Sequence, residues 1–303
     1  MILITGATGF IGQHLIAWLA GHQYPICALI HPSQRERRFA PGISLQLVSG
    51  DVTNPVVLRM AMHHVDTVFH LAGIDAESAA GAFDAINVEG TRNVIDAMRE
   101  AGVTRLITLS PIGADPHSAY PYLRSKGLAA ELITHSGLDF TLIRSSAVYG
   151  SGDDWTETIG LALRRLPFIF PIAGDGRSRL QPISMTDLIT CLDTCLTDPQ
   201  TIKQTYTIGG PQHMTFEEIV NTIGEATHHR RRPRYLRSPT ALRFAKFIRS
   251  LLNGRLLYTT TDLDLLAIDR TTTLDSVAYQ FDFTPARMSA SLDYLLARTR
   301  RVR

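Results

Sequence analysis

The sequence predicts an α/β protein, with a doubly wound parallel sheet and a smaller C-terminal α/β lobe. Three observations lead to this prediction. The chain begins with an apolar strand, a glycine turn and a helix. Apolar runs then recur about every 20–35 residues between helical patterns, which is typical of right-handed βαβ units. After Gly150 the alternation loosens, so we expect a first domain over 1–150 and an interleaved lobe over 151–303.

The first strand and the turn after it contain the most specific pattern in the chain. Residues 1–4 are apolar, as in a strand buried on both faces, and a helical apolar period follows over 11–19. Between them Gly6, Gly9 and Gly12 follow the spacing G-x-x-G-x-x-G. Such glycines permit a tight turn, close approach to a pyrophosphate and close helix packing, and the helix start favours phosphate. We therefore predict a Rossmann-type dinucleotide site; the alternative is a glycine-rich turn without a ligand.

The remaining elements follow in order. Further strands are predicted at 26–30, 44–48, 67–71, 106–109, 140–143 and 205–208, and helices at 54–64, 83–101, 122–136, 187–196 and 216–226. Pro55 stands at an early position of its helix, and Gly102 stops the long one. Residues 151–154 are expected to be a loop, and 167–176 are rich in Pro and Gly.

Composition excludes several classes of function. A net charge of +2 gives no strong general attraction to nucleic acid or to membranes. Three cysteines form no disulfide framework, and the first strand begins at Met1, so we expect a reducing, cytoplasmic location without a signal peptide. No apolar run approaches the ~20 residues of a membrane span. No histidine, cysteine or carboxylate pattern has metal-ligand spacing, so no metal is expected.

Tyr122 and Lys126 are the strongest catalytic candidates. They lie one helical turn apart on the same face. A nearby ammonium lowers the pKa of a phenol from its usual ~10, so the tyrosine can exchange a proton with an alcohol or carbonyl. With nine tyrosines and three lysines in 303 residues, chance gives only about 0.1 such pairs. The alternative is a surface pair that supports the helix.

Several motifs together resemble the short-chain dehydrogenase/reductase superfamily, in its extended and atypical branches. They are Thr5-Gly-Ala-Thr-Gly-Phe-Ile-Gly12, Gly50-Asp-Val52, His70-Leu-Ala-Gly73, Asn87-Val-Glu-Gly-Thr-Arg-Asn93 and Tyr122-x-x-x-Lys126. Downstream, the segments at 144–150, 181–187 and 206–211 resemble the group that contains the 39-kDa accessory subunit of respiratory complex I and its bacterial relatives.

The resemblance implies roles for individual residues. It assigns the pyrophosphate to Gly6, Thr8, Gly9, Phe10, Ile11 and Gly12, and the adenine to Asp51 and Val52. It also implies that Ala72 and Gly73 line the cofactor, that Lys126 bonds the nicotinamide ribose, and that Ser145, Ser146 and Val148 lie by the carboxamide. The sequence departs from the pattern of the superfamily at the catalytic serine, because Pro111 and Ile112, which have no hydroxyl, follow Ser110. Either Ser110 takes that role or the hydroxyl is missing.

The end of the second strand predicts a preference for NADP(H) over NAD(H). A carboxylate there would select NAD by binding the ribose 2′-hydroxyl, yet no Asp or Glu occurs between Gly9 and Arg35. The strand ends at His31, and Ser33, Arg35, Arg37 and Arg38 follow, which suit a 2′-phosphate.

The substrate is predicted to be a small molecule but not a nucleotide sugar. Sugar-nucleotide epimerases resembling this chain usually carry an Arg seven residues before the position of Asp187, where Leu180 stands here. We therefore expect an oxidoreductase, epimerase or isomerase whose C-terminal lobe forms a substrate pocket over the nicotinamide. The alternative is a non-catalytic accessory protein of a respiratory or other membrane complex. The basic amphipathic segment 238–257 suits peripheral membrane contact, but such a segment more often covers a substrate cleft or packs on the lobe. The sequence does not indicate an oligomeric state.

Overall fold

The computed structural model describes residues 1–34, 39, 42–77 and 79–297. They divide into two compact units, one made of 1–144 with 189–207 and the other of 145–188 with the described residues from 208 onward. The chain therefore leaves the first unit after residue 144 and returns to it over 189–207 before it completes the second.

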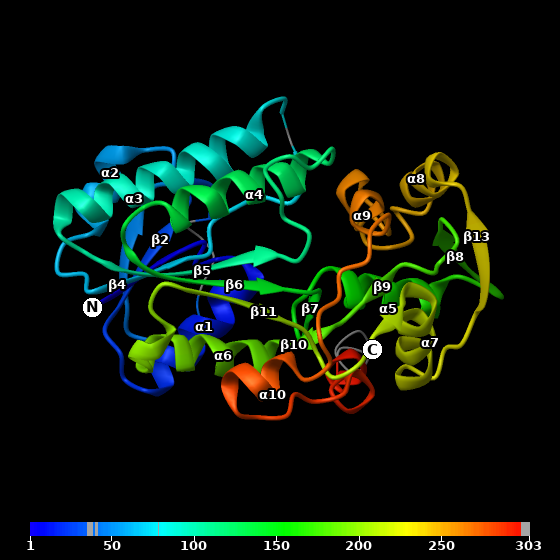
Figure 1. Ribbon diagram of the computed structural model, residues 1–303. Coiled ribbons are helices and arrows are strands. Elements are labelled where there is room, and N and C mark those ends of the chain that lie inside the picture. The colour runs from blue at the N-terminus through cyan, green and yellow to red at the C-terminus, as the bar shows by residue number, and fades with distance from the viewer. Residues whose placement is uncertain (35–38, 40–41, 78, 298–303) are drawn as a thin grey trace. The chain divides into compact units, whose positions relative to one another are not determined.

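The first unit contains a seven-stranded sheet with the order β11-β6-β5-β4-β1-β2-β3 (Figure 1). The strands are β1 (Ile2–Thr5), β2 (Ile26–Ile30), β3 (Gln46–Ser49), β4 (Thr67–His70), β5 (Arg105–Pro111), β6 (Asp139–Ser145) and β11 (Gln204–Ile208). The pairs β2–β3, β1–β2, β1–β4 and β4–β5 are parallel. The order reverses beside β1, so the predicted doubly wound α/β fold is confirmed.

Helices cover both faces of this sheet. Figure 1 shows α1 and α6 on one face and α2, α3 and α4 on the other. Their bounds are α1 (Phe10–Gly21), α2 (Pro55–Ala61), α3 (Gly90–Ala101), α4 (Pro121–Thr134) and α6 (Met185–Thr197). All residues of β1 and β2 are buried, because helices lie on both sides of them. Trp18 Nε1 on α1 donates to Asp193 Oδ1 on α6 at 3.1 Å, which joins the two helices of one face.

The helix predicted over 83–101 differs from the observed one at its start. Residues Asp84–Glu89 form a π-helical turn, and the α-helix α3 begins only at Gly90. A π-helical turn is wider than an α-helical one and often marks a functional position. Here it contains the buried Asn87.

The second unit is built from short strand pairs and helices around one apolar core. Its strands are β7 (Val148–Tyr149), β8 (Ile169–Ala173), β9 (Arg179–Leu180), β10 (Ile183–Ser184), β12 (Met214–Thr215) and β13 (Arg232–Leu236), paired as β7–β10, β9–β12 and β8–β13. Its helices are α5 (Trp155–Arg165), α7 (Phe216–Ala226), α8 (Ser238–Phe247), α9 (Thr260–Leu265), α10 (Ser276–Phe281) and α11 (Tyr294–Ala297). The segment 167–176, although rich in Pro and Gly, thus contains β8. Its parallel partner β13 contains two arginines.

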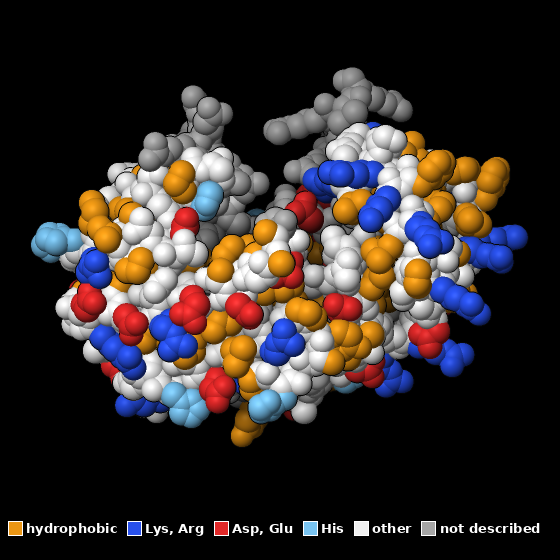
Figure 2. Space-filling view, turned by 90° about the horizontal axis from the view of Figure 1, so that it is seen from above, with side chains coloured by type: hydrophobic (Ala, Val, Ile, Leu, Met, Phe, Trp, Pro, Cys, Tyr) orange, Lys and Arg blue, Asp and Glu red, His pale blue; other side chains and the backbone are white. Residues whose placement is uncertain are grey.

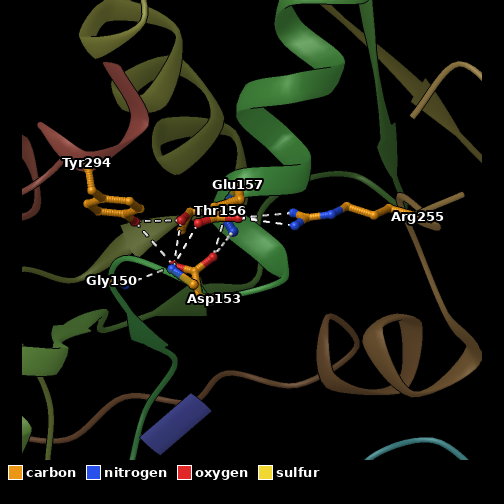
Figure 3. Close-up of polar contacts among 7 residues, drawn as sticks. Gly150, Asp153, Thr156, Glu157, Arg255 and Tyr294 are labelled. Atoms are coloured by element: carbon orange, nitrogen blue, oxygen red, sulfur yellow. Dashed lines mark hydrogen bonds and ion pairs between the residues drawn. The ribbon is translucent and has the colours of Figure 1, made fainter. Parts of the chain in front are cut away.

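A buried carboxylate fixes the first turn of α5 (Figure 3). Asp153 accepts hydrogen bonds from the backbone N–H groups of Gly150 and Thr156, both at 2.8 Å, and from the hydroxyl of Tyr294 at 3.2 Å. Burial raises the pKa of Asp153, although hydrogen bonds from the Thr156 side chain and from the backbone of Gly150, Glu157 and Thr156 act to lower it. Beside it, the buried Glu157 pairs with Arg255 at 3.2 Å.

Candidate functional site

The glycine turn after β1 requires glycine at two positions. Gly6 has φ of +69°, and a Cβ there would lie 2.6 Å from the backbone oxygen of Leu71. A Cβ at Gly12 would lie 2.3 Å from the Gly6 oxygen, so α1 packs directly on the turn. Gly9 is the N-cap of α1 and offers no side-chain acceptor to the first N–H groups of the helix. Thr8, Phe10 and Ile11, half-buried, complete the loop. A helix start of this kind suits a phosphate.

Two polar side chains end the neighbouring strands β1 and β4. Thr5 and His70 are paired in the strand register, and Thr5 Oγ1 lies 2.8 Å from His70 Nδ1. Thr5 Oγ1 also accepts the N–H of Ala72 at 3.2 Å. The second residue of the loop after β4 is therefore held to the strand that precedes the glycine turn.

The second nitrogen of His70 fixes its tautomer. His70 Nε2 lies 2.9 Å from Thr91 Oγ1, and Thr91 donates its hydroxyl proton to the Asn87 oxygen at 2.6 Å. Because Thr91 has only one proton to donate, Nε2 must carry the proton and Nδ1 must accept from Thr5. Burial, and then the charge of Lys126, lower the pKa of His70 to about 3, so it is neutral near pH 7.

Asn87 joins the π-helical turn to the loop after β4 and to α4. Its Oδ1 accepts the N–H of Ile74 at 2.9 Å. Its Nδ2 donates to the Ile74 oxygen and to Ser125 Oγ, both at 3.0 Å. Ser125 in turn donates to the Tyr122 oxygen at 2.8 Å. Asn87 therefore fixes the first turn of α4, where Tyr122 lies, relative to the end of β4.

Tyr122 and Lys126 occupy successive turns of α4, as predicted from their spacing. Tyr122 is half-buried, with its ring centroid 5.9 Å from that of Phe83. A Cβ at Gly73 would lie 3.0 Å from Lys126 Nζ and 3.0 Å from Asn87 Oδ1. Glycine at 73 thus leaves room for the ammonium and the amide beside the loop after β4. Burial lowers the pKa of Lys126 to about 8, against an opposing effect of Asp75, so the amine is still mostly charged at pH 7.

Ser110 lies near the end of β5, which neighbours β4. Its side chain is 5% exposed, and its hydroxyl has no hydrogen-bond partner within the described part of the chain. A buried hydroxyl without a partner is costly, because it loses its bonds to water. Such an atom suits a site where a ligand supplies the missing bond. Pro111 ends the strand, and Ile112 lies in the turn that follows it.

The residues assigned to the adenosine end lie around the ends of β2 and β3. His31 Nδ1 bonds the Ser33 hydroxyl at 2.7 Å, and His31 Nε2 lies 3.7 Å from Asp51 Oδ2. Asp51 Oδ1 accepts the N–H of Thr53 at 2.7 Å, and Val52 is buried. Arg35, Arg37 and Arg38, which complete the predicted 2′-phosphate site, lie outside the described residues.

The residues assigned to the carboxamide belong to the second unit. Ser145 is buried at the end of β6. Ser146 Oγ donates to the Arg270 oxygen at 2.8 Å and accepts from the Gln181 N–H at 3.0 Å. Val148 lies in β7, paired with Ile183. The roles assigned to Ser145, Ser146 and Val148 stay predictions.

Thr5, His70 and Asn87 lie within the motifs described above, but the sequence alone assigns these three residues no role. A usable signal existed for the first two, since each is a polar residue that ends an apolar strand. Asn87 has no such local signal, because its position depends on a π-helical turn that the sequence pattern does not show.

Among the described residues, no cluster of three or more histidines, cysteines and carboxylates is arranged to hold a metal ion. None of the described helices has the length and apolarity needed to cross a bilayer.

Comparison with known proteins agrees with this arrangement. A family model described as NAD(P)H-binding matches residues 6–160. The ceramide reductase of Caulobacter vibrioides is 31% identical over 166 residues, covering 53% of this chain and 50% of that protein. The mitochondrial NADH-ubiquinone oxidoreductase 40 kDa subunit of Neurospora crassa is 22% identical over 235 residues, covering 76% and 60%. The chain thus spans one half to three fifths of the length of these two relatives.

Solved structures share the fold over the whole chain. MoeE5 in complex with UDP-glucuronic acid and NAD has a TM-score of 0.76 at 21% identity, covering 100% of this chain and 99% of that one. The UDP-glucose 4-epimerase of Thermotoga maritima, solved with UDP-glucose, has a TM-score of 0.74 at 18% identity, with 99% of each chain covered.

Proposed function

Because the chain belongs to the NAD(P)H-binding family, we propose that it is an oxidoreductase of the short-chain dehydrogenase type, or an epimerase or isomerase using transient oxidation, that acts on an alcohol or carbonyl substrate. The observation that supports this proposal is the position of Lys126. It lies one turn from Tyr122 on α4, and its ammonium lies so close to Gly73 that a Cβ at residue 73 would be 3.0 Å from it.

The residues of the first unit fit a nicotinamide dinucleotide. The glycine turn leaves space that side chains would fill, and the unpartnered Ser110 hydroxyl offers a hydrogen bond. Gly6, Gly9 and Gly12 would hold the pyrophosphate, Asp51 the adenine, and Lys126 the ribose. When bound, the nicotinamide donates or accepts a hydride. In the proposed mechanism Tyr122 Oη gives or takes the proton, the Lys126 charge favours the phenolate, and Ser110 Oγ orients the substrate oxygen.

We propose NADP(H) as the preferred cofactor. The described structure has no carboxylate at the end of β2, where His31 stands instead. Asp51 bonds Thr53 and lies beside His31, which leaves it poorly placed to select a ribose 2′-hydroxyl.

We propose a substrate that is smaller or more apolar than a nucleotide sugar. Leu180 replaces the arginine usual in the epimerases, is 2% exposed, and belongs to the apolar core of the second unit. A buried diphosphate needs a compensating cation. The ceramide reductase relative supports a carbonyl on an apolar molecule. Turnover of a UDP- or dTDP-sugar would contradict this part of the proposal.

The experiment compares Tyr122→Phe with Tyr120→Phe. Tyr120 is the extended N-cap of α4, so it is a matched control on the same segment. NADPH consumption is measured with a panel of ketones and aldehydes of increasing chain length, and NADPH affinity by fluorescence titration. We expect Tyr122→Phe to keep NADPH affinity and to lose turnover by ~100-fold or more, the usual worth of a positioned proton donor. Full activity of Tyr122→Phe would refute the assignment.

The second candidate is a non-catalytic NADP(H)-binding accessory protein of a membrane complex, held at a membrane surface by peripheral contact. The relatives named as subunits of NADH-ubiquinone oxidoreductase favour it. The same panel separates the two candidates. If NADPH binds with unchanged affinity but no ketone or aldehyde is reduced, the accessory role is favoured.

A further inference from the structure

One stretch of the second unit carries an unusual concentration of positive charge. Between Glu225 and Asp262 the sequence has no Asp or Glu. The same stretch contains nine basic residues, which are Arg230, Arg231, Arg232, Arg234, Arg237, Arg243, Lys246, Arg249 and Arg255. For a chain with a net charge of only +2, this is a marked local excess.

Most of this charge is not neutralised by carboxylates. In the part of the chain that the structure describes, only Arg230 and Arg255 form ion pairs, with Glu225 at 2.9 Å and Glu157 at 3.2 Å. Six of the remaining cations are exposed, namely Arg232, Arg234, Arg237, Arg243, Lys246 and Arg249. Intramolecular ion pairing therefore does not account for the composition of the stretch.

Large apolar side chains are exposed among these cations. α8 buries Ala241, Ala245 and then Ile248 in the core of the unit. On its outer side Phe247 is 82% exposed, one turn after Arg243 and next to Lys246. Leu251, one further turn along, is 41% exposed.

A second exposed aromatic lies at the start of the β8–β13 pair. Phe168 is 84% exposed, and its backbone oxygen accepts the N–H of Arg232 at 3.0 Å. Ile169, 44% exposed, is the register partner of Arg232. Figure 2 shows Lys and Arg side chains gathered with hydrophobic ones over the part of the molecule that carries α8 and β13.

We propose that this basic–apolar surface, made of Phe168, Arg232, Arg234, Arg243, Lys246 and Phe247, binds the surface of an anionic phospholipid bilayer. Guanidinium groups bind lipid phosphates in a bidentate way, and the exposed phenyl rings enter the boundary between headgroups and acyl chains. The inference deepens the proposed membrane contact and is independent of catalysis. Exposed Leu251 and Ile169 favour a bilayer over nucleic acid, because aliphatic side chains do not stack on bases.

The test is co-sedimentation of the full-length protein with vesicles. One set is pure phosphatidylcholine and the other contains about 30% phosphatidylglycerol, both at roughly 0.1 M salt. We expect binding to the anionic vesicles only, with release at about 0.5 M salt. The triple variant Arg232→Ser, Arg243→Ser and Lys246→Ser should lower the partition coefficient by ~100-fold, since each basic residue near an anionic surface contributes about fivefold.

Two control variants test whether the position of the substitutions matters. One removes three positive charges and the other removes two large apolar side chains, both from exposed positions outside the proposed surface. Arg59→Ser, Arg92→Ser and Lys203→Ser, all exposed in the first unit, should change partitioning less than about threefold. Phe168→Ser with Phe247→Ser should weaken binding, whereas Met60→Ser with Tyr279→Ser, also exposed, should not. Far-UV circular dichroism verifies that each variant is folded.

Three results would overturn the proposal. The first is no binding to anionic vesicles, or equal binding to both vesicle types. The second is equal loss of binding in the two triple variants. The third is displacement of the protein from anionic vesicles by a single-stranded oligonucleotide at equal phosphate concentration, which would identify the surface as a nucleic-acid site.

Discussion

Thr5 Oγ1 lies 2.8 Å from His70 Nδ1, at the ends of the adjacent strands β1 and β4. The imidazole is neutral, carries its proton on Nε2, and has hydroxyl partners on both sides. A neutral buried histidine of this kind holds the glycine turn and the loop after β4 together, and it makes the stability of the first unit sensitive to acid.

We predict an acid-labile contribution from His70. Its pKa is lowered in the folded state to about 3 from an ordinary 6.5. The unfolded chain therefore binds one more proton between these values, and stability falls as the pH falls below about 7. From pH 7.5 to 5 the loss is about 2 kcal/mol. Urea unfolding of His70→Asn should show a shallower pH dependence over this range, whereas the exposed control His135→Asn should keep the wild-type slope. Identical slopes in the two variants would contradict the assignment.

Gly73→Ala should weaken NADPH binding. The new methyl would lie 3.0 Å from both Asn87 Oδ1 and Lys126 Nζ. Asn87 Oδ1 is held in place by its hydrogen bond to Ile74, whereas Lys126 Nζ is the end of a flexible side chain. The ammonium should therefore move, and we expect a loss of about 3–10-fold in affinity, the size of one hydrogen bond. Gly21→Ala, with nothing within 4 Å of its Cβ, is the matched control. Wild-type NADPH affinity in Gly73→Ala would show that Lys126 does not serve the cofactor.

His31→Asp should reverse the predicted cofactor preference. A carboxylate at the end of β2 repels a 2′-phosphate and accepts a bond from a 2′-hydroxyl. Relative to wild type, the ratio of NADPH affinity to NADH affinity should fall by ~10-fold or more. NADPH binding weakens and NADH binding strengthens, each by about 1 kcal/mol, and both changes lower the ratio. His63→Asp adds the same charge at an exposed turn after α2 and should leave the ratio unchanged. If the wild-type protein binds NADH at least as tightly as NADPH, the proposed preference for NADP(H) is wrong.

The ion pair between Glu157 and Arg255 should contribute measurably to stability. Glu157 is 6% exposed at its side chain and also accepts the N–H of Gly152 at 2.8 Å. Arg255→Met removes the ion-pair partner of that buried carboxylate, which should cost about 2 kcal/mol, somewhat less than for a fully buried pair. Arg59→Met removes a pair with Glu100 that is half exposed on both sides and should cost less than about 1 kcal/mol. Equal losses in chemical denaturation would mean that burial of Glu157 has no energetic consequence.

The sequence predicted the elements of the first unit well, because their signals are local. The strands at 26–30 and 67–70 are short apolar runs, which predict a buried strand from the local sequence alone. In the second unit α7 was predicted at 216–226, but other elements lack such signals. α5 buries Thr156, Glu157 and Thr158, which obscures its apolar period. β13 contains three polar or proline residues and forms a strand only because β8 pairs with it.

The candidate site was predictable in its residue types and less so in its electrostatics. The spacing of Tyr122 and Lys126 follows from helical geometry alone. The neutral state of His70 does not, because it depends on Thr91, which only the packing of α3 beside the end of β4 brings within reach. In the same way, the unpartnered Ser110 hydroxyl reflects burial from several elements, whereas the sequence shows only a serine followed by proline.

The return of residues 189–207 to the first unit decides how the chain can be divided in the laboratory. A fragment that ends at Gly150 would lack α6 and β11, and so would expose the hydrogen-bonding edge of β6 and the face where Asp193 bonds Trp18. Open strand edges recruit other chains, so such a fragment should precipitate instead of folding. To obtain the first unit alone, the chain would join Gly150 to residue 189 through a short linker and end after β11, since the residues that follow β11 belong to the second unit.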